Sequence, residues 1–210
     1  MKTGFIFPTI NKILYSINKI NLVELFKFIG VKIVSKKGGL EEKIIASRFA
    51  VDAFIVTKWI LLIVLWIIKV SNGLWVFIIW YLIVMNAYTY FFYHIWSTEI
   101  LDDHYFDIER IKRRFLNLLL AITYTIFGFA YLYNCPYSSN FQWAYGEPNF
   151  FQSLWYSLAN SLTANYDQVK PTTSLGYSVS MVQLVIVFIF ITIIIGCSIP
   201  QIKTSKKEEK

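Results

Sequence analysis

The sequence predicts an all-α integral membrane protein with four transmembrane helices. Of its 210 residues, 56% are hydrophobic and 16% are charged, whereas globular proteins have about 45–50% apolar and about 25% charged residues. The mean hydropathy is +0.51, and four apolar stretches are long enough for a membrane-crossing helix. A soluble chain of this length would have too little polar surface to cover so large an apolar fraction.

Each apolar stretch predicts one span. The first is expected over residues 53–70, and the uncharged turn Ser71–Gly73 makes it an antiparallel hairpin with the second, over 74–96. The third and fourth are expected over 115–133 and 177–199. At about 1.5 Å per residue, such helices cross most of a hydrocarbon layer of about 30 Å.

Composition divides the chain into five segments. They are an N-terminal segment, the helical hairpin, a charged linker helix, the last two spans with the stretch between them, and a basic tail (1–50, 51–97, 98–114, 115–200 and 201–210). In the first segment I-N-K-I recurs after seven residues, which predicts one or two amphipathic helices on the inner membrane surface. A poorly ordered segment is the alternative. Lys36–Gly39 is expected to break the chain before a further short helix.

The net charge of +7 lies mainly beside the apolar stretches. Residues 1–50 hold nine Lys and Arg against three acids, and Arg110–Arg114 directly precede the third span. This placement favours a cell-membrane protein with both termini in the cytoplasm and residues 134–174 outside or re-entrant. The basic N-terminal segment is expected to contact anionic lipids. Nucleic acid is not an expected partner, because no aromatic residues interleave with Arg as in a nucleic-acid groove.

Enzymatic and metal chemistry are not expected. Cys135 and Cys197 fall at opposite ends of the layout, so no disulfide is predicted, and two Cys with two His are a poor metal inventory. The acids and histidines of residues 94–104 run into Arg110–Arg114, as in a solvated helix at the inner membrane face. We therefore predict no catalytic residue and no cofactor, and a signal peptide is not expected.

Lys58 lies inside the first predicted span. An ionisable residue within a membrane favours a functional role by default. Since Lys58 is about one and a half turns from the cytoplasmic end of that span, the prediction is instead that its ammonium reaches the membrane surface. Asp52 is the expected local partner.

A short apolar helix and a polar run lie between the last two spans. Residues 150–162 favour a helix, but thirteen residues are too few to cross a bilayer. The run T-A-N-Y-D-Q-V-K-P (Thr163–Pro171) follows directly. Non-helical backbone at membrane depth is tolerated only where protein or water shields it, so this pattern predicts a re-entrant loop that lines a water-filled path.

A resemblance to the pore loop of the potassium-channel superfamily runs without gaps through S-L-W-Y-S-L-A-N-S-L-T-A-N-Y-D-Q-V-K-P-T-T-S-L-G. The matching positions are the aromatic-aromatic-Ser of the pore helix, the filter Thr and Tyr, the following Pro, and the Leu-Gly that opens the inner helix (Trp155–Ser157, Thr163, Tyr166, Pro171 and Leu175-Gly176). The resemblance covers about residues 115–199. It implies a pore domain in a homotetramer that conducts potassium or sodium ions passively. It assigns the filter to Thr163, Ala164, Asn165, Tyr166 and Asp167, and the filter support to Trp155, Tyr156, Gln168 and Pro171.

Departures from the family pattern change the expected filter. Asn165 and Asp167 replace its two glycines, and Gln168 replaces the Asp that follows. Asn and Asp are the non-glycine residues that most readily adopt positive φ, so near-filter geometry is expected at some cost in strain. Four Asp167 carboxylates would concentrate cations or hold a divalent ion, and potassium selectivity is expected to weaken. Trp155 and Gln168 correspond to a hydrogen-bonded pair that braces the family's filter.

The resemblance places four residues on the pore-lining face of the inner helix, namely Phe188, Ile191, Ile195 and Ile199. An apolar lining can gate by dewetting. Positions facing lipid or the core are the alternative, because apolar residues fill the whole helix. Val187 stands where the family has its hinge glycine, which puts bending there in doubt.

Two functions follow from these patterns. The leading prediction is a weakly selective cation channel subunit, and the alternative is a non-conducting membrane scaffold that keeps the pore-loop fold. No Lys or Arg lies between Leu74 and Trp96, so steep voltage gating is not expected.

Overall fold

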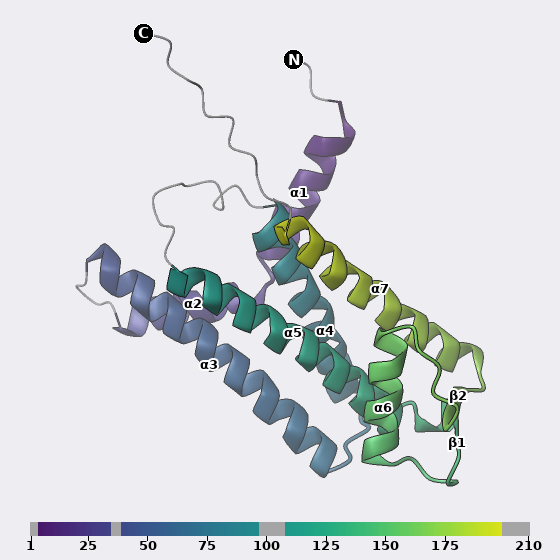
Figure 1. Cartoon of the computed structure of the whole chain (residues 1–210). Coiled ribbons are helices and arrows are strands. Elements are labelled where there is room, and N and C mark those ends of the chain that lie inside the picture. Colours follow the sequence, from purple (N-terminus) through teal and green to yellow (C-terminus); the bar gives the residue numbers. More distant parts are fainter. Residues whose placement is uncertain (1–3, 35–38, 97–107, 199–210) are drawn as a thin grey trace.

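The computed structural model describes residues 4–34, 39–96 and 108–198, and helices make up most of them (Figure 1). The elements in chain order are α1 (Ile6–Asn18), α2 (Leu22–Val34), α3 (Leu40–Ile67), α4 (Gly73–Phe91), the π-turn η1 (Phe92–Trp96), α5 (Ile108–Asn134), the 3-10 turn η3 (Ser138–Asn140), β1 (Phe141–Trp143), α6 (Phe150–Ser161), β2 (Val169–Pro171) and α7 (Ser174–Ser198).

Four of these helices are long and apolar enough to cross a membrane, which confirms the prediction of an all-α membrane protein. The candidate spans are Glu42–Ile67 in α3, Gly73–Phe91 in α4, Phe115–Asn134 in α5 and Ser174–Ile193 in α7. These four helices run lengthwise through the molecule (Figure 1). The α6 helix and the two strands lie at one end, and α1 lies toward the other.

The α3 helix is continuous over 28 residues and longer than predicted. The short helix expected after Lys36–Gly39 is not separate from the first span, because α3 begins at Leu40 and runs to Ile67. No Gly or Pro interrupts the sequence between these residues, so no helix-breaking residue stops it. The chain turns just beyond it, where Lys69 has a positive φ of 52°.

The amphipathic helices predicted in the N-terminal segment are α1 and α2. Ile6, Phe7 and Ile13 of α1 are exposed. Trp96 joins α1 to the end of η1, because its indole donates to Asn11 Oδ1 (2.9 Å) and its ring stacks on Phe7. An exposed apolar side on a helix with a polar opposite side is typical of a helix that lies in a membrane interface.

The α2 helix packs closely on α3 at a glycine. A Cβ added at Gly30 would lie 2.7 Å from Cβ of Ala50 and 3.4 Å from the carbonyl oxygen of Ala46. Ala46 and Ala50 are one helical turn apart, so small residues of α3 face Gly30. Such contacts let two helix backbones approach closely without a large hydrophobic driving force.

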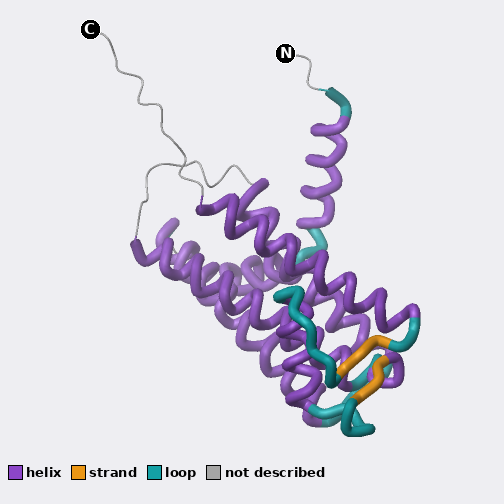
Figure 2. Tube along the Cα trace, turned by 45° about the vertical axis from the view of Figure 1, so that its right-hand side comes forward, coloured by secondary structure: helices purple, strands orange, loops and turns teal. Residues whose placement is uncertain are grey.

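A two-stranded antiparallel ladder closes the α6 end of the molecule (Figure 2). Its register places Phe141 opposite Pro171. Since β1 comes soon after α5 and β2 comes just before α7, the ladder ties the end of one span to the start of another. The Tyr133 ring packs at 5.0 Å from both Phe141 and Tyr156, which joins the ladder, α5 and α6 in one aromatic cluster.

Replacing Gly30 with Leu is expected to separate α2 from α3, because the new side chain meets Ala50 and the backbone of Ala46. Overpacking of this kind costs about 1–3 kcal/mol. Limited proteolysis in detergent, with cleavage sites mapped by mass spectrometry, should show new cuts in α2 only. Gly73→Leu is the matched control, since a Cβ there meets no atom within 4 Å. Equal protection of α2 in Gly30→Leu and the wild type would contradict this packing.

Candidate functional site

The α6 helix begins and ends at polar residues. Asn149 caps it: its Oδ1 accepts from the Phe151 amide (2.8 Å), and its carbonyl oxygen accepts from the Ser153 hydroxyl (2.8 Å). The helix ends at Ser161 after 12 residues, and Thr163 then has a positive φ of 55°. This left-handed residue turns the chain into the polar run, so the short helix and the non-helical run both lie where the sequence predicted them.

Gln183 of α7 holds α6 and α5 through one buried amide. Its Oε1 accepts from the Tyr133 hydroxyl (2.6 Å) and from Asn160 Nδ2 (2.9 Å). Its Nε2 lies 2.9 Å from the Ser157 carbonyl oxygen and 2.8 Å from the hydroxyls of Ser157 and Ser161. The amide is fully buried, where a polar group without partners is costly, and here it bonds residues of two neighbouring helices.

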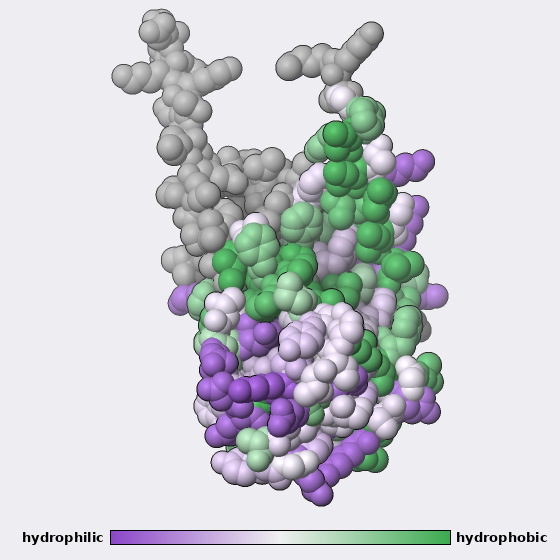
Figure 3. All heavy atoms as spheres, turned by 90° about the vertical axis from the view of Figure 1, so that its right-hand side faces the viewer, coloured by the Kyte–Doolittle hydropathy of each residue, from purple (hydrophilic) through white to green (hydrophobic). Residues whose placement is uncertain are grey.

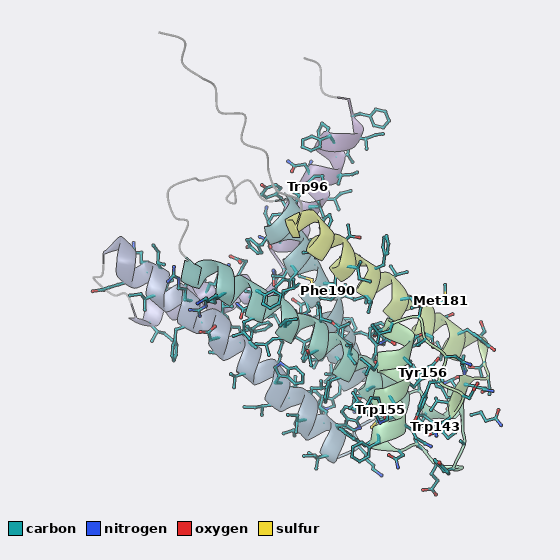
Figure 4. All side chains as sticks on the ribbon, viewed as in Figure 1. Trp96, Trp143, Trp155, Tyr156, Met181 and Phe190 are labelled. Carbon is teal, nitrogen blue, oxygen red and sulfur yellow. The ribbon has the colours of Figure 1, made fainter. Side chains whose placement is uncertain are left out.

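A second row of polar contacts lies one turn nearer to the start of α7. The hydroxyls of Tyr156 and Ser180 are 2.9 Å apart, and Asn160 Nδ2 donates to the Ser180 carbonyl oxygen (3.0 Å). Tyr156 lies on the part of α6 close to α7 (Figure 4). Sequence reasoning did not single out Gln183, Asn160 or Ser180. The available signal was a Gln and a Ser inside an otherwise apolar span.

The loop after α6 is exposed in the single chain. Four of the five residues assigned to the filter are exposed, and Tyr166 is partly buried; the four are Thr163, Ala164, Asn165 and Asp167. Asn165 Nδ2 donates to Asp167 Oδ1 (3.1 Å), and Lys170 Nζ lies 3.4 Å from the same oxygen. The Asp167 side chain is 74% accessible, so its carboxylate faces solvent beside a cation.

The prediction of a positive φ at the two substituted filter positions is wrong for this chain. Asn165 and Asp167 do not have positive φ; among the described non-glycine residues only Lys69 and Thr163 do. The reversal occurs at Thr163, before the two positions where the family has glycine. The side-chain hydrogen bond between Asn165 and Asp167 then stabilises the loop without a second left-handed residue.

The brace predicted between Trp155 and Gln168 is not formed within the described chain. Gln168 Oε1 instead accepts from the Tyr166 hydroxyl (2.8 Å), and Trp155 is 53% accessible. Desolvation, and to a smaller extent the neighbouring Tyr145, raises the pKa of Tyr166. The hydroxyl therefore keeps its proton at neutral pH and remains the donor to Gln168.

The segment from Pro171 to Gly176 packs on one backbone carbonyl. A Cβ added at Gly176 would lie 2.5 Å from the Asn140 carbonyl oxygen. The same oxygen accepts from the amide (2.9 Å) and the hydroxyl (3.1 Å) of Thr172, and the Thr173 hydroxyl donates to Asn140 Oδ1 (2.7 Å). The Leu-Gly motif therefore needs glycine at this position, because a side chain there would clash with the Asn140 carbonyl. Asn140, its contact, carries no signal in the sequence.

The α7 helix has a buried and an exposed face. Phe190 is buried, whereas Phe188 is 67% and Ile191 is 45% accessible. The two predicted lining residues that can be placed thus lie on the exposed face, while the Ile195 side chain and Ile199 lie outside the described residues. Viewed from the side that carries the strands and the start of α7, hydrophobic residues gather in the upper part of the described surface, and hydrophilic residues gather at the end with the strands (Figure 3).

Lys58 does not reach the membrane surface, contrary to the prediction. It is 5% accessible, and its Nζ donates to Asn86 Oδ1 of α4 (2.7 Å). Its ammonium also lies 4.5 Å from the centroid of the Tyr124 ring. Asp52, the expected partner, is paired with Arg113. The prediction failed because it considered the position along one helix, whereas the partner comes from the next.

Within the described residues, no three or more His, Cys, Asp and Glu side chains are grouped to bind a metal ion. The His94 side chain, residues 97–107 and the Cys197 side chain lie outside those residues. Cys135 is a free cysteine, and burial raises the pKa of its thiol to about 11, with a smaller opposing effect of Lys69. Such a thiol stays protonated and unreactive at neutral pH.

The chain matches no known protein family, no curated protein and no solved structure. Its functional interpretation therefore rests on its own residues. These supply a short helix bonded between two spans, an exposed polar loop with one carboxylate, and an apolar helix face that the chain itself leaves uncovered.

Replacing Gln183 with Leu is expected to destabilise the protein by at least about 1–3 kcal/mol, since Tyr133 and Asn160 lose a buried partner. Unfolding in detergent, followed by tryptophan fluorescence, measures the difference. Gln152→Leu is the matched control: Gln152 is buried on α6, and neither polar atom of its side chain has a described hydrogen-bond partner. Its removal should be neutral or stabilising. Equal losses in both variants would contradict the role given to Gln183.

Proposed function

We propose that the chain is one subunit of a homotetrameric cation channel with an altered filter. The observation that carries this proposal is α6, a 12-residue helix bonded to two spans and followed by an exposed polar loop. Non-helical backbone among membrane-spanning helices needs protein or water around it. One re-entrant helix and loop from each of four subunits, gathered around an axis, would supply both. The resemblance to the potassium-channel pore loop supports the same arrangement.

Four copies would also cover apolar side chains near the loop. Leu162 is 68% accessible and Trp155 is 53% accessible in the single chain. Large exposed apolar patches rimmed by polar residues mark interaction surfaces. Because water is expected around the loop, lipid is unsuited to contact Leu162. The proposal therefore requires that a neighbouring subunit packs on this side chain.

Charge supports one orientation in the cell membrane. Arg48 and Arg113 lie in the first halves of α3 and α5, away from the loop, whereas the loop end carries Lys69, Glu147, Asp167 and Lys170. The positive-inside rule then places the loop outside and both termini in the cytoplasm. In this orientation the apolar side of α1 would lie in the inner membrane surface, with the basic residues of the N-terminal segment against anionic lipids.

In the proposed pore, Thr163–Asp167 from four subunits surround the ion path. Rings of backbone carbonyls replace part of the ion's hydration, and four Asp167 carboxylates attract cations to the outer mouth. Without glycine at Asn165 and Asp167, fewer sites of filter geometry form, so we infer weak selection between potassium and sodium and sensitivity to external calcium. Conduction is passive, and no catalytic residue or resident cofactor belongs to the proposal.

A non-conducting membrane scaffold is the second candidate function, and one observation favours it. Asp167 is hydrogen-bonded to Asn165 and paired with Lys170, and neither filter substitution has positive φ. Inward rings of carbonyls require unusual backbone angles, which Asn165 and Asp167 do not have in the single chain. In that case the chain would assemble through its pore-loop fold without passing ions.

Asp167→Asn is expected to change cation flux through liposomes that contain the purified full-length chain. Loss of the carboxylate ring should weaken calcium block by about tenfold, the equivalent of 1.4 kcal/mol of binding. Flux of potassium, sodium and a bulky organic cation is measured with and without external calcium. Glu147→Gln is the control, because Glu147 is another exposed carboxylate at the same end.

The outcomes of this flux experiment separate the two candidate functions. Wild-type flux that both variants leave unchanged would remove Asp167 from the ion path. A tetramer, established by native mass spectrometry, that passes no cation under any gradient would favour the scaffold. A chain that forms no tetramer would contradict the pore.

Phe188→Cys is expected to react with a charged, membrane-impermeant thiol reagent, and the reaction should reduce flux, because Phe188 would line a water-filled vestibule. The background carries Cys135→Ser and Cys197→Ser, and labelling is quantified by mass spectrometry. Phe190→Cys is the control, since Phe190 is buried two residues further along the same helix. Equal resistance of both cysteines to the reagent would place Phe188 against lipid instead.

A further inference from the structure

A cavity of about 190 Å³ lies between α2, α3 and α4, with one lining residue each from η1 and α5 and none from α6 or α7. Most of the lining is apolar, with Leu22, Phe54, Ile55, Leu82 and Met85 among the contributors. A cavity of about 150 Å³ already admits a molecule of the size of benzene. The cavity is therefore large enough for a small apolar molecule, and its mainly apolar walls favour one.

Two lysines also line the cavity: Lys27, which is paired with Glu24, and Lys58, which is buried. The Lys58 ammonium carries three N–H donors. One is directed to Asn86 Oδ1, and the ammonium also lies near the face of the Tyr124 ring. An amide oxygen and a ring face reduce the cost of burying the charge, but neither carries the opposite charge.

No acidic partner for Lys58 lies in the described part of the chain, where every ion pair within 4.0 Å involves other cations. Glu24, on the helix that closes the cavity, is paired with Lys27 (2.7 Å) and accepts from the Tyr93 hydroxyl (2.6 Å). Asp52 is paired with Arg113. A buried ammonium within a membrane span is costly unless an anion joins it, so an anionic ligand would stabilise the charged form of Lys58.

Asn86 positions the Lys58 ammonium. Its Nδ2 donates to the Ala121 carbonyl oxygen (2.9 Å) and lies 3.3 Å from the Thr125 hydroxyl. These two contacts from α5 orient the amide so that its oxygen points to Lys58. The ammonium is therefore held on the cavity wall by a polar chain that crosses from α3 through α4 to α5.

We propose that this cavity binds a small amphipathic carboxylate, whose anionic group pairs with Lys58 and whose apolar body fills the remaining space. Charge complementarity selects an anion, and the apolar walls select an organic anion over a hydrated inorganic ion. The size of the cavity excludes a two-tailed lipid as the enclosed ligand. The site does not depend on the proposed pore, because binding requires no contact with the loop.

Octanoate is the probe, with octanol as its uncharged counterpart. Saturable binding to the full-length protein in detergent is measured by calorimetry and by NMR of carboxyl-labelled octanoate. In Lys58→Met, octanoate affinity should fall by about tenfold or more, while octanol binding stays as in the wild type. Lys69→Met is the control, because Lys69 is exposed and is not in the cavity lining. Equal octanoate affinity in the wild type and Lys58→Met would overturn the proposal.

A measurement on the wild-type protein tests the same site without depending on the folding of a variant. A diazirine derivative of octanoate, activated by light, should form adducts on α3 and α4 residues of the cavity, such as Met85, and excess octanoate should suppress them. Adducts confined to outward-facing positions, or unaffected by octanoate, would overturn the proposal. Both readouts report binding alone, so they remain informative whether or not the chain conducts ions.

Discussion

The end of the molecule that carries α6 and its loop depends on the hydrogen bonds of the Gln183 amide. A 12-residue helix cannot cross a bilayer, and the backbone beyond it has no helical partners of its own. Gln183 accepts from Tyr133 of α5 and bonds Ser157 and Asn160 of α6. Because the amide is buried, each of its bonds forms where water does not compete. This side chain and the aromatic cluster of Tyr133, Phe141 and Tyr156 together hold α6 between its neighbours.

The geometry of the loop then follows from where α6 is held. Its end defines the point at which Thr163 reverses the chain, and the ladder to β1 limits where the loop can return. Gly176 completes the arrangement, because only glycine leaves room for the Asn140 carbonyl at the start of α7. A channel and a scaffold would both need this frame. They differ in whether the loop between Thr163 and Pro171 would pass ions in the proposed tetramer.

Local composition predicted most of the fold, and contacts between distant residues account for what it missed. The four spans and the short helix were predictable, because hydropathy and length are properties of a continuous stretch. The partner of Lys58 is in another helix, and the contact between Asn140 and Gly176 joins the ends of two connections, so neither is visible in any one window. The prediction of positive φ at Asn165 and Asp167 was wrong, because the conformational propensity of Asn and Asp permits a positive φ without requiring it.

The bond between Lys58 and Asn86 also bears on how the protein enters the membrane during synthesis. A lysine at the centre of a helix costs about 2.5–3.5 kcal/mol on insertion scales, so Lys58 offsets part of the gain from the apolar residues of α3. Its partner is on α4, which follows after a short turn and emerges next. Once Asn86 lies beside Lys58, the lysine side chain has a hydrogen-bond partner within the pair of helices α3 and α4. On this argument the helical hairpin of α3 and α4 enters the bilayer at a lower cost than α3 would alone.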